Sequence, residues 1–119
     1  MFTAECHCGN VKLATKNIPD SLLSCNCSIC NRVGALWAYY KKEDVEIITK
    51  DAPTSIYLWD KKEIELHHCP DCGCTTHYSS SGENGERKTA INARMADLKI
   101  TENIPVKKFD GADSWKFIS

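Results

Sequence analysis

The chain has 119 residues, 42% of them hydrophobic, and a formal net charge of −1 with acidic and basic residues interspersed. This size suits one globular domain over residues 1–119, and the near-neutral charge excludes the broad cationic surface with which proteins neutralise nucleic-acid phosphates. The apolar stretches, such as residues 33–40, are far shorter than the roughly 20 residues of a membrane-spanning helix. We therefore expect a soluble domain with neither a nucleic-acid nor a membrane partner.

The first predicted elements are strands. Residues 11–16 alternate apolar with polar or small side chains, and breaker residues follow them. Residues 36–40, 45–49 and 55–59 are rich in aromatic and β-branched residues, which favour a pleated surface. Each of these segments predicts one strand.

A hairpin is predicted in the middle of the chain. Residues 63–67 alternate with period two, and a turn at 60–62 joins them to the strand at 55–59. Residues 79–86 contain Ser, Gly and Asn without apolar anchors, which is typical of an exposed loop, and residues 88–93 predict the last strand. The hairpin leads directly into a group of cysteines.

Helices contribute little to the expected fold. Short helical turns are expected at residues 28–32 and 95–98, and no segment has the pattern of a long helix. No internal repeat or linker divides the chain. The sequence therefore predicts a mainly β fold in a single domain.

The cysteines are confined to three short clusters. They are Cys6 and Cys8; Cys25, Cys27 and Cys30; and Cys69, Cys72 and Cys74. Thiolates so close in sequence can converge on one soft or borderline metal ion such as zinc. The clustering therefore predicts metal binding.

Disulfides are the competing use of these cysteines. A bridge between Cys6 and Cys8 would close a very small ring and strain the disulfide, although bridges between clusters remain possible. The segment Met1 to Glu5 has neither the basic start nor the apolar run of an export signal, so we expect a cytoplasmic location. Cysteine clusters in the reducing cytosol more often hold metal.

Two of the clusters can combine into a closed site. Cys69 and Cys72, followed by Gly73, have the form of a zinc knuckle, in which a tight turn directs backbone N–H groups at sulfur. Cys6 and Cys8 can supply the second pair of thiolates. Such a site has no vacancy for substrate, so its expected role is structural.

Cys25, Cys27 and Cys30 are then left as a triplet. Three protein ligands with one open position distinguish a catalytic zinc from a structural one. The triplet is therefore the candidate catalytic centre.

Four segments carry a family resemblance. They are residues 6–9 (CHCG), 25–34 (CNCSICNRVG), 69–73 (CPDCG) and 91–98 (INARMADL). In order and spacing, over nearly the whole chain, they resemble the glutathione-dependent formaldehyde-activating enzyme family, which also includes the centromere protein V domain.

The resemblance implies a fold, two metals and a reaction. The fold is the β-tent, built of twisted antiparallel sheets stapled by zinc. The implied ligands are Cys6, Cys8, Cys69 and Cys72 for a structural zinc, and Cys25, Cys27 and Cys30 for an exchangeable catalytic zinc. The implied chemistry is that of a carbon–sulfur lyase, in which glutathione or a similar thiol adds to an aldehyde, with formaldehyde giving S-hydroxymethylglutathione. An open zinc position can take the sulfur and deprotonate it.

A cation is expected near the triplet, because glutathione carries two carboxylates. Arg32, just after the triplet, is the first candidate for a substrate carboxylate contact, and Arg94 is the second. Either side chain can equally be a solvated or structural arginine.

Cys74 departs from the family pattern, in which a small hydroxyl residue is more usual at this position. As a fourth ligand it would close the second site and leave no open position. It can instead be a buried free thiol that packs as a small hydrophobe, or a redox partner that bridges to the triplet after metal loss. The sequence leaves these three alternatives open.

Other side chains have weaker claims. His77 is the favoured proton carrier near the second zinc, and His7, which alternates with two ligands, is expected either at the surface or as a neighbour that supports a ligand. Trp37, Tyr39 and Tyr40 are expected mainly in the core, with a substrate wall as the minority interpretation.

Two function classes remain. One is a small zinc enzyme acting on thiol adducts, and the other is a zinc-stabilised binding or scaffold module without turnover, since a fold alone does not fix activity.

Overall fold

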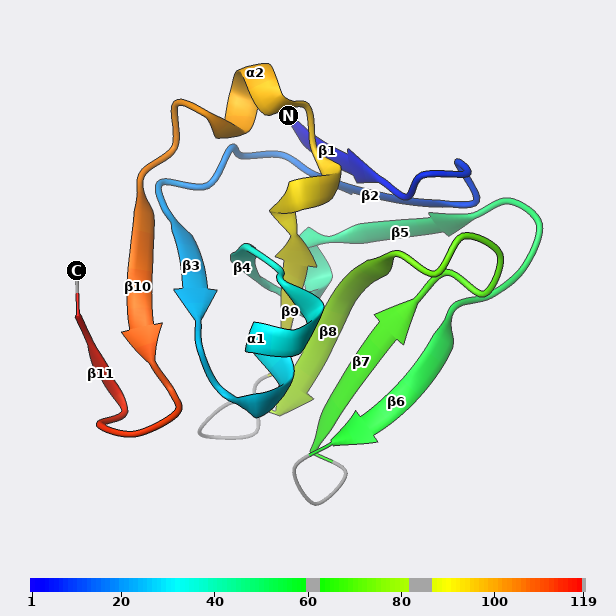
Figure 1. The fold of residues 1–119 in the computed structure, drawn as a ribbon. Coiled ribbons are helices and arrows are strands. Elements are labelled where there is room, and N and C mark those ends of the chain that lie inside the picture. The colour runs from blue at the N-terminus through cyan, green and yellow to red at the C-terminus, as the bar shows by residue number, and fades with distance from the viewer. Residues whose placement is uncertain (60–62, 82–86, 119) are drawn as a thin grey trace.

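The computed structural model of the chain describes residues 1–59, 63–81 and 87–118 and forms two β-sheets with short helices beside them (Figure 1). The smaller sheet has the order β1-β2-β5 and consists of β1 (Phe2–Glu5), β2 (Val11–Thr15) and β5 (Glu46–Thr49). The larger sheet has the order β11-β10-β3-β4-β9-β8-β7-β6. Its strands are β3 (Leu22–Cys25), β4 (Trp37–Lys41), β6 (Ser55–Trp59), β7 (Ile64–His68), β8 (Thr75–Ser81), β9 (Arg87–Asn92), β10 (Val106–Asp110) and β11 (Lys116–Phe117). The prediction of a mainly β fold is confirmed.

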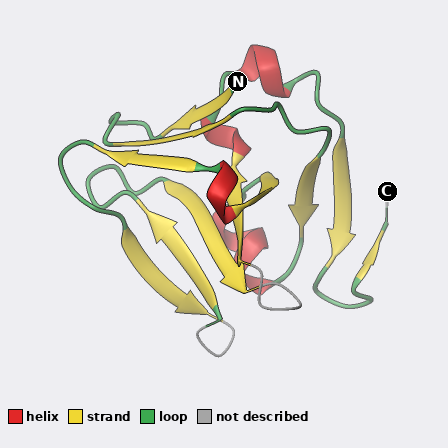
Figure 2. Ribbon diagram, turned by 180° about the vertical axis from the view of Figure 1, so that it is seen from behind, coloured by secondary structure: helices red, strands yellow, loops and turns green. Residues whose placement is uncertain are grey.

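The small sheet follows directly from the alternation in β2. Val11, Leu13 and Thr15 are buried while Lys12 is exposed, so one face of the strand packs against the core. The strand predicted at 11–16 is confirmed, as is the one predicted at 45–49, where β5 pairs antiparallel with β2. Seen from behind, this sheet lies across the upper part of the molecule (Figure 2).

The hairpin of β6 and β7 is also confirmed. The two strands pair antiparallel with Trp59 opposite Ile64, and the turn predicted at 60–62 lies outside the described residues. β8 follows the third cysteine cluster and pairs with β7, with a register shift at His67 and His68. The hairpin therefore positions one cysteine pair at the end of β7.

The sequence did not predict several strands of the larger sheet. β3, β10 and β11 were not recognised, and β10 pairs with β3 in parallel, unlike the other pairs in the part of the chain that the structure describes. β9 matches the strand predicted at 88–93 but is not the last strand. β8 continues through the first residues of the loop predicted at 79–86, whose residues 82–86 lie outside the described ranges.

The helices are short, as expected. α1 (Ser28–Val33) confirms the helical turn predicted at 28–32, and it lies in front of the large sheet, with β3 and β10 to one side and β7 and β6 to the other (Figure 1). The turn predicted at 95–98 is split between the 3-10 helix η3 (Ala93–Met95) and α2 (Leu98–Thr101), because the Asp97 side chain caps α2 by accepting from the Lys99 N–H at 2.9 Å. A further 3-10 helix, η1, spans Lys42–Asp44. None of the helices among the described residues has the length and apolarity to span a membrane.

Two hydrophobic clusters hold these layers together. The first joins the sheets and contains Phe2, Leu13, Leu22 and Ile91 together with the buried Cys69. The second consists of Ala35, Trp37, Leu66 and Ala90, against which Ile29 and Cys30 pack. Each cysteine group is thus anchored in its own part of the core.

Candidate metal centres and the cavity beside them

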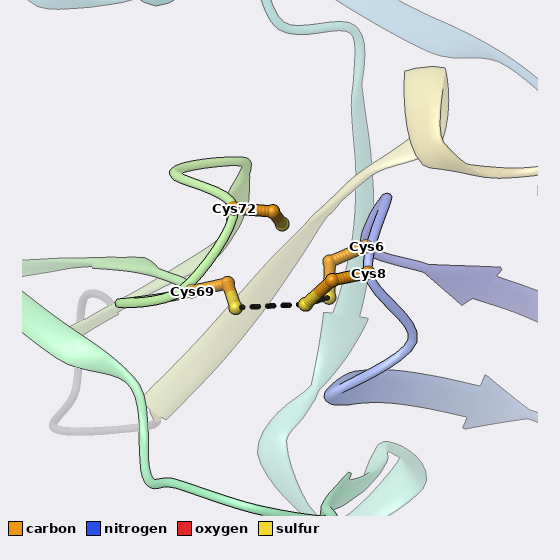
Figure 3. Close-up of side chains that lie close together, drawn as sticks. All are labelled: Cys6, Cys8, Cys69 and Cys72. Carbon is orange, nitrogen blue, oxygen red and sulfur yellow. Dashed lines mark hydrogen bonds between the residues drawn. The ribbon is translucent and has the colours of Figure 1, made fainter.

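The first cysteine group brings together residues that are more than 60 positions apart. The sulfurs of Cys6, Cys8, Cys69 and Cys72 all lie within 4.8 Å of one another, and Figure 3 shows them converging from two loops. The Sγ atoms of Cys6 and Cys8 are 3.8 Å apart, and those of Cys8 and Cys69 are 3.6 Å apart. A tetrahedral zinc site with Zn–S bonds of about 2.3 Å has sulfur–sulfur edges of about 3.8 Å. The four thiols therefore fit a closed tetrahedral zinc site.

Two tight turns create this arrangement. Gly9 has φ +83° and Gly73 has φ +80°, conformations that L side chains rarely adopt, and the Gly73 N–H donates to the Cys69 carbonyl at 2.9 Å. Backbone N–H groups of Cys74 and Cys8 stabilise the Cys72 thiolate and lower its pKa to about 6. The knuckle thus favours the thiolate form of Cys72, which is the form that binds metal, before any metal is bound.

Asn10 joins this cluster to a neighbouring loop, and sequence analysis missed it. Its side chain is buried; Nδ2 donates to the Ala52 carbonyl at 2.9 Å and to Cys69 Sγ at 3.6 Å, while Oδ1 accepts from the N–H groups of Asp51 and Ala52. Asn10 is one polar residue in a short loop, and nothing in the sequence around it indicates contacts with residues about 40 to 60 positions away.

The second group consists of Cys25, Cys27 and Cys30, whose sulfurs also lie within 4.8 Å of one another. Cys25 ends β3, Cys27 is the N-cap of α1, and Cys30 lies inside α1. The Trp37 indole Nε1 donates to Cys30 Sγ at 3.3 Å, and the Cys27 N–H donates to Cys25 Sγ at 3.5 Å. Three soft sulfur donors at this spacing fit a zinc ion.

The turn after β10 lies against this triplet. A Cβ on Gly111 would stand 2.7 Å from Cys25 Sγ and 3.0 Å from Cys27 Cβ, so only glycine fits without displacement. Asn26 holds the turn in place: its Nδ2 donates to Asp110 Oδ1 at 3.1 Å and its Oδ1 accepts from the Ala112 N–H at 2.9 Å. Sequence analysis missed Gly111 because residues this far apart reveal no contact in a single sequence.

A cavity of about 760 Å³ opens beside the triplet. Its wall includes the three cysteines and Arg32, and much of the rest is aromatic. The aromatic side chains include Trp37, Tyr39, Trp59, Tyr78, Phe109 and Trp115. The chain has three tryptophans, and every one of them lines this cavity. The volume lies within the roughly 300–1,000 Å³ typical of small-molecule sites.

Tyr39 and Tyr78 form a hydroxyl pair in the cavity wall. The Tyr78 hydroxyl donates to the Tyr39 hydroxyl at 2.9 Å. Burial raises the pKa of Tyr78 to about 12 and raises that of Tyr39 further above its usual range. Both phenols are therefore neutral near neutral pH, and Tyr39 keeps its own O–H free to donate. The interpretation of Tyr39 and Trp37 as a substrate wall thus gains support, while the Tyr40 hydroxyl donates to the Asn17 carbonyl.

Cys74 lies with the first group and not with the triplet. Its thiol neighbours Cys72 and the backbone of His7, and its side chain packs against the core. Among the described residues, the triplet has no fourth candidate ligand within the same reach. The alternative in which Cys74 closes the second site is therefore wrong, and its position beside the first group favours packing as a free thiol over a bridge to the triplet.

The two arginine candidates differ in position. Arg32 lines the cavity, but its guanidinium donates to the Ser28 carbonyl of its own helix at 2.8 Å. Arg94 is exposed and is not part of the described cavity wall. The structure therefore favours Arg32 over Arg94 as a substrate contact.

His77 does not have the surroundings of a proton carrier. It is buried, stacks on His67 with ring centroids 4.1 Å apart, and its Nδ1 bonds the Thr76 hydroxyl at 2.8 Å. Burial lowers the pKa of His77 to about 3, and the described cavity wall does not include it. The prediction of a proton-carrying role was wrong because the strand turns this ring into the core. His7 is exposed, as expected.

Comparison with known proteins identifies a family for these features. The family model described as glutathione-dependent formaldehyde-activating enzyme matches residues 1–107. A crystal structure of a Rhodobacter sphaeroides protein, a structural-genomics target, is similar with a TM-score of 0.70 and 21% identity, covering 87% of this chain and 98% of that chain. At this identity the likeness shows the fold alone. No curated protein matches the chain.

Proposed function

Because the chain belongs to the glutathione-dependent formaldehyde-activating enzyme family, we propose that it is a zinc-dependent enzyme of the carbon–sulfur lyase type. It joins and separates a low-molecular-weight thiol, such as glutathione, and an aldehyde, such as formaldehyde. One observation carries this proposal: three cysteine sulfurs converge in the wall of a cavity, with no fourth candidate ligand within the same reach in the described chain. A closed scaffold site would need no such cavity beside it.

The two cysteine groups take different roles. Cys6, Cys8, Cys69 and Cys72 would hold a structural metal, which would tie the start of the chain to the knuckle. Cys25, Cys27 and Cys30 would hold an exchangeable zinc, which would supply a binding position for a thiol and favour its thiolate form. Clustered cysteines that bind metal are typical of a reducing compartment, so the proposal includes a cytoplasmic location.

The reaction needs no oxidant. The thiol sulfur forms a bond to the carbonyl carbon, the C=O π pair moves to oxygen, and the proton released by the thiol ends on that oxygen to give a hemithioacetal. Cleavage is the reverse of these steps. The protein therefore has to hold the sulfur, expel water and provide a hydrogen-bond donor for the oxygen.

Tyr39 is the donor that we assign to the oxygen. The Tyr39 hydroxyl accepts a hydrogen bond from the Tyr78 hydroxyl, which orients it and leaves its own O–H available to donate to a substrate oxygen. A neutral phenol can stabilise the developing charge on an alkoxide without being ionised itself. Arg32, the charged side chain in the described wall, remains the candidate contact for a carboxylate on the thiol.

Two measurements test the proposal. With ¹³C-labelled formaldehyde and glutathione, exchange NMR should show that the zinc-loaded protein accelerates formation and cleavage of the adduct, and that Cys27→Ser abolishes the acceleration. In parallel, a chelator should remove one zinc quickly and the other slowly, with thiol perturbing only the fast one. Two equally inert metals and no acceleration would instead indicate the non-catalytic module.

A further inference from the structure

We propose that the thiol handled at this site carries an apolar body about the size of an aromatic ring, and that Trp115 and Phe117 select for it. This inference rests on the proposed function and names its substrate class. It comes from the cavity wall and from the C-terminal segment, residues 109–118.

The cavity wall contains few charged side chains that could pair with a charged thiol. Apart from the cysteines and the two neutral tyrosines, Arg32 is the one ionisable side chain in the described wall, and its guanidinium already donates to the Ser28 carbonyl at 2.8 Å. Glutathione brings two carboxylates and an ammonium group, which lose hydration in a cavity and need charged partners there. A ligand with an apolar body meets no such demand, because leucine, isoleucine and aromatic side chains surround the triplet.

The C-terminal segment presents aromatic surface to this cavity. Trp115 is 69% exposed and Phe117 is 58% exposed, although both line it. Phe109 stands between them, with ring centroids 5.0 Å from each and edge-to-face geometry. An apolar ligand held at the cysteine triplet would cover these faces, and that burial is the source of selectivity.

The backbone holds Trp115 in place for this contact. Its φ is +55°, in the left-handed region that bulky residues rarely adopt. The Trp115 N–H donates to the Asp110 carbonyl at 2.7 Å, and the Asp110 carboxylate accepts from both the N–H and the hydroxyl of Ser114. Such an outlier persists where the surroundings fix it, and here they fix an exposed indole beside the cavity.

The residues proposed to select the substrate lie in a different part of the chain from the cysteines proposed to bind its sulfur. The family match ends at residue 107, so Phe109, Gly111, Trp115 and Phe117 all lie beyond it. The cysteine triplet lies inside the match. The residues proposed to select the substrate therefore lie outside the matched range, whereas the residues proposed to bind the sulfur lie inside it.

The test uses the zinc-loaded protein and three probes: phenylmethanethiol, phenylmethanol and glutathione. Since all three tryptophans line the cavity, intrinsic fluorescence reports binding, and calorimetry gives the heat-capacity change. We expect phenylmethanethiol to bind at least about tenfold more tightly than glutathione and with a negative heat-capacity change, the mark of apolar burial. Along a series of linear alkanethiols, each added methylene should tighten binding about fourfold.

The probes distinguish failure of this inference from failure of the proposed function. If glutathione binds as tightly as phenylmethanethiol or more so, the apolar inference is overturned while thiol binding stands. If phenylmethanol binds as tightly as phenylmethanethiol, sulfur contributes nothing, and the proposed thiol chemistry fails. If none of the probes binds, both are overturned.

Variants of the exposed aromatic residues test their role directly. Trp115→Ala and Phe117→Ala should each weaken phenylmethanethiol binding about five- to tenfold, weaken glutathione binding much less, and leave the zinc content unchanged. Tyr57→Ala, at a residue that is 53% exposed and outside the described cavity wall, is the matched control and should change neither affinity. An equal loss for both thiols in the two segment variants, or no loss for either, would overturn the selection role.

Discussion

Gly111 stands so close to Cys25 that a methyl group on the glycine would lie 2.7 Å from the sulfur. The contact joins the turn after β10 to the end of β3. It also makes the geometry of the cysteine triplet depend on a residue outside the triplet.

Gly111→Ala should therefore disturb the second metal site alone. We expect the variant to retain one zinc and lose the other, with thiol binding reduced at least about tenfold, because a side chain at van der Waals overlap must push Cys25 or the turn aside. Metal content by mass spectrometry under non-denaturing conditions checks this. Ala112→Ser, which adds one atom at the exposed neighbouring position, is the control. Two zinc ions bound with unchanged affinity in Gly111→Ala would contradict the contact.

The two cysteine groups should respond differently to the same substitution. Cys69→Ser should unfold the domain, since Cys69 is buried in the main core and zinc binding at structural sites contributes roughly 10–16 kcal/mol, as much as the whole stability of a typical domain. Cys27→Ser, at the half-buried start of α1, should leave the fold intact and abolish thiol binding. Circular dichroism and fluorescence titration distinguish the two outcomes. Global unfolding of Cys27→Ser would argue against an open second site.

Tyr39→Phe should reduce the rate without affecting thiol binding. Loss of one preorganised donor to a developing oxyanion typically costs about 100-fold or more in kcat. Tyr78→Phe should cost less, about tenfold, because it removes the group that orients Tyr39 and not the donor itself. Exchange NMR gives the rate and fluorescence the thiol affinity, with the exposed Tyr57→Phe as control. A rate that is unchanged in Tyr39→Phe would remove this residue from the mechanism.

Asn10→Ala should destabilise the domain by about 2–4 kcal/mol, because it leaves the Asp51 and Ala52 amides and a carbonyl without their side-chain partner. Urea denaturation of the zinc-loaded protein measures this change. Asn17→Ala removes the side chain of an exposed asparagine and should be neutral within about 0.5 kcal/mol. Equal effects of the two substitutions would mean that the Asn10 contacts contribute no net stability.

His77 should make the stability depend on pH. Its pKa falls from 6.5 to about 3 on folding because burial disfavours the imidazolium. The unfolded chain therefore binds more protons between these values, so the stability is complete above about pH 6.5 and decreases as the pH falls, by about 2 kcal/mol at about pH 5.

Urea midpoints across this pH range check the His77 prediction. His77→Gln, which keeps a hydrogen-bonding group beside Thr76, should show a flatter pH profile, whereas the exposed His7→Gln should match the unsubstituted protein. Parallel profiles for all three proteins would show that another group causes the pH dependence.

The sequence predicted those elements whose signal is local. The alternation at 11–16 and the hairpin of 55–59 with 63–67 appear as β2, β6 and β7, because their period-two patterns reflect burial of one face. β10 was missed because Val106, Lys107 and Lys108 are all exposed, so its strand state depends on parallel pairing with β3 and not on its own pattern.

The same distinction holds for the candidate site. Cysteine spacing indicated which thiols share a site, since thiols close in sequence can reach the same ion, and the structure brings the sulfurs together within each of the two groups as expected. The surroundings could not be predicted, because the contacts of Gly111 with Cys25 and of Asn10 with Cys69 join distant segments. The direction of the His77 side chain likewise depended on the register of β8.

An anomalous-scattering map at the zinc edge, from crystals soaked with phenylmethanethiol, tests the central claim most directly. We predict one peak enclosed by the sulfurs of Cys6, Cys8, Cys69 and Cys72, and a second peak bound by Cys25, Cys27 and Cys30 whose fourth ligand is the soaked thiol. A second peak whose fourth ligand comes from the protein, or a single peak after zinc loading, would contradict the account.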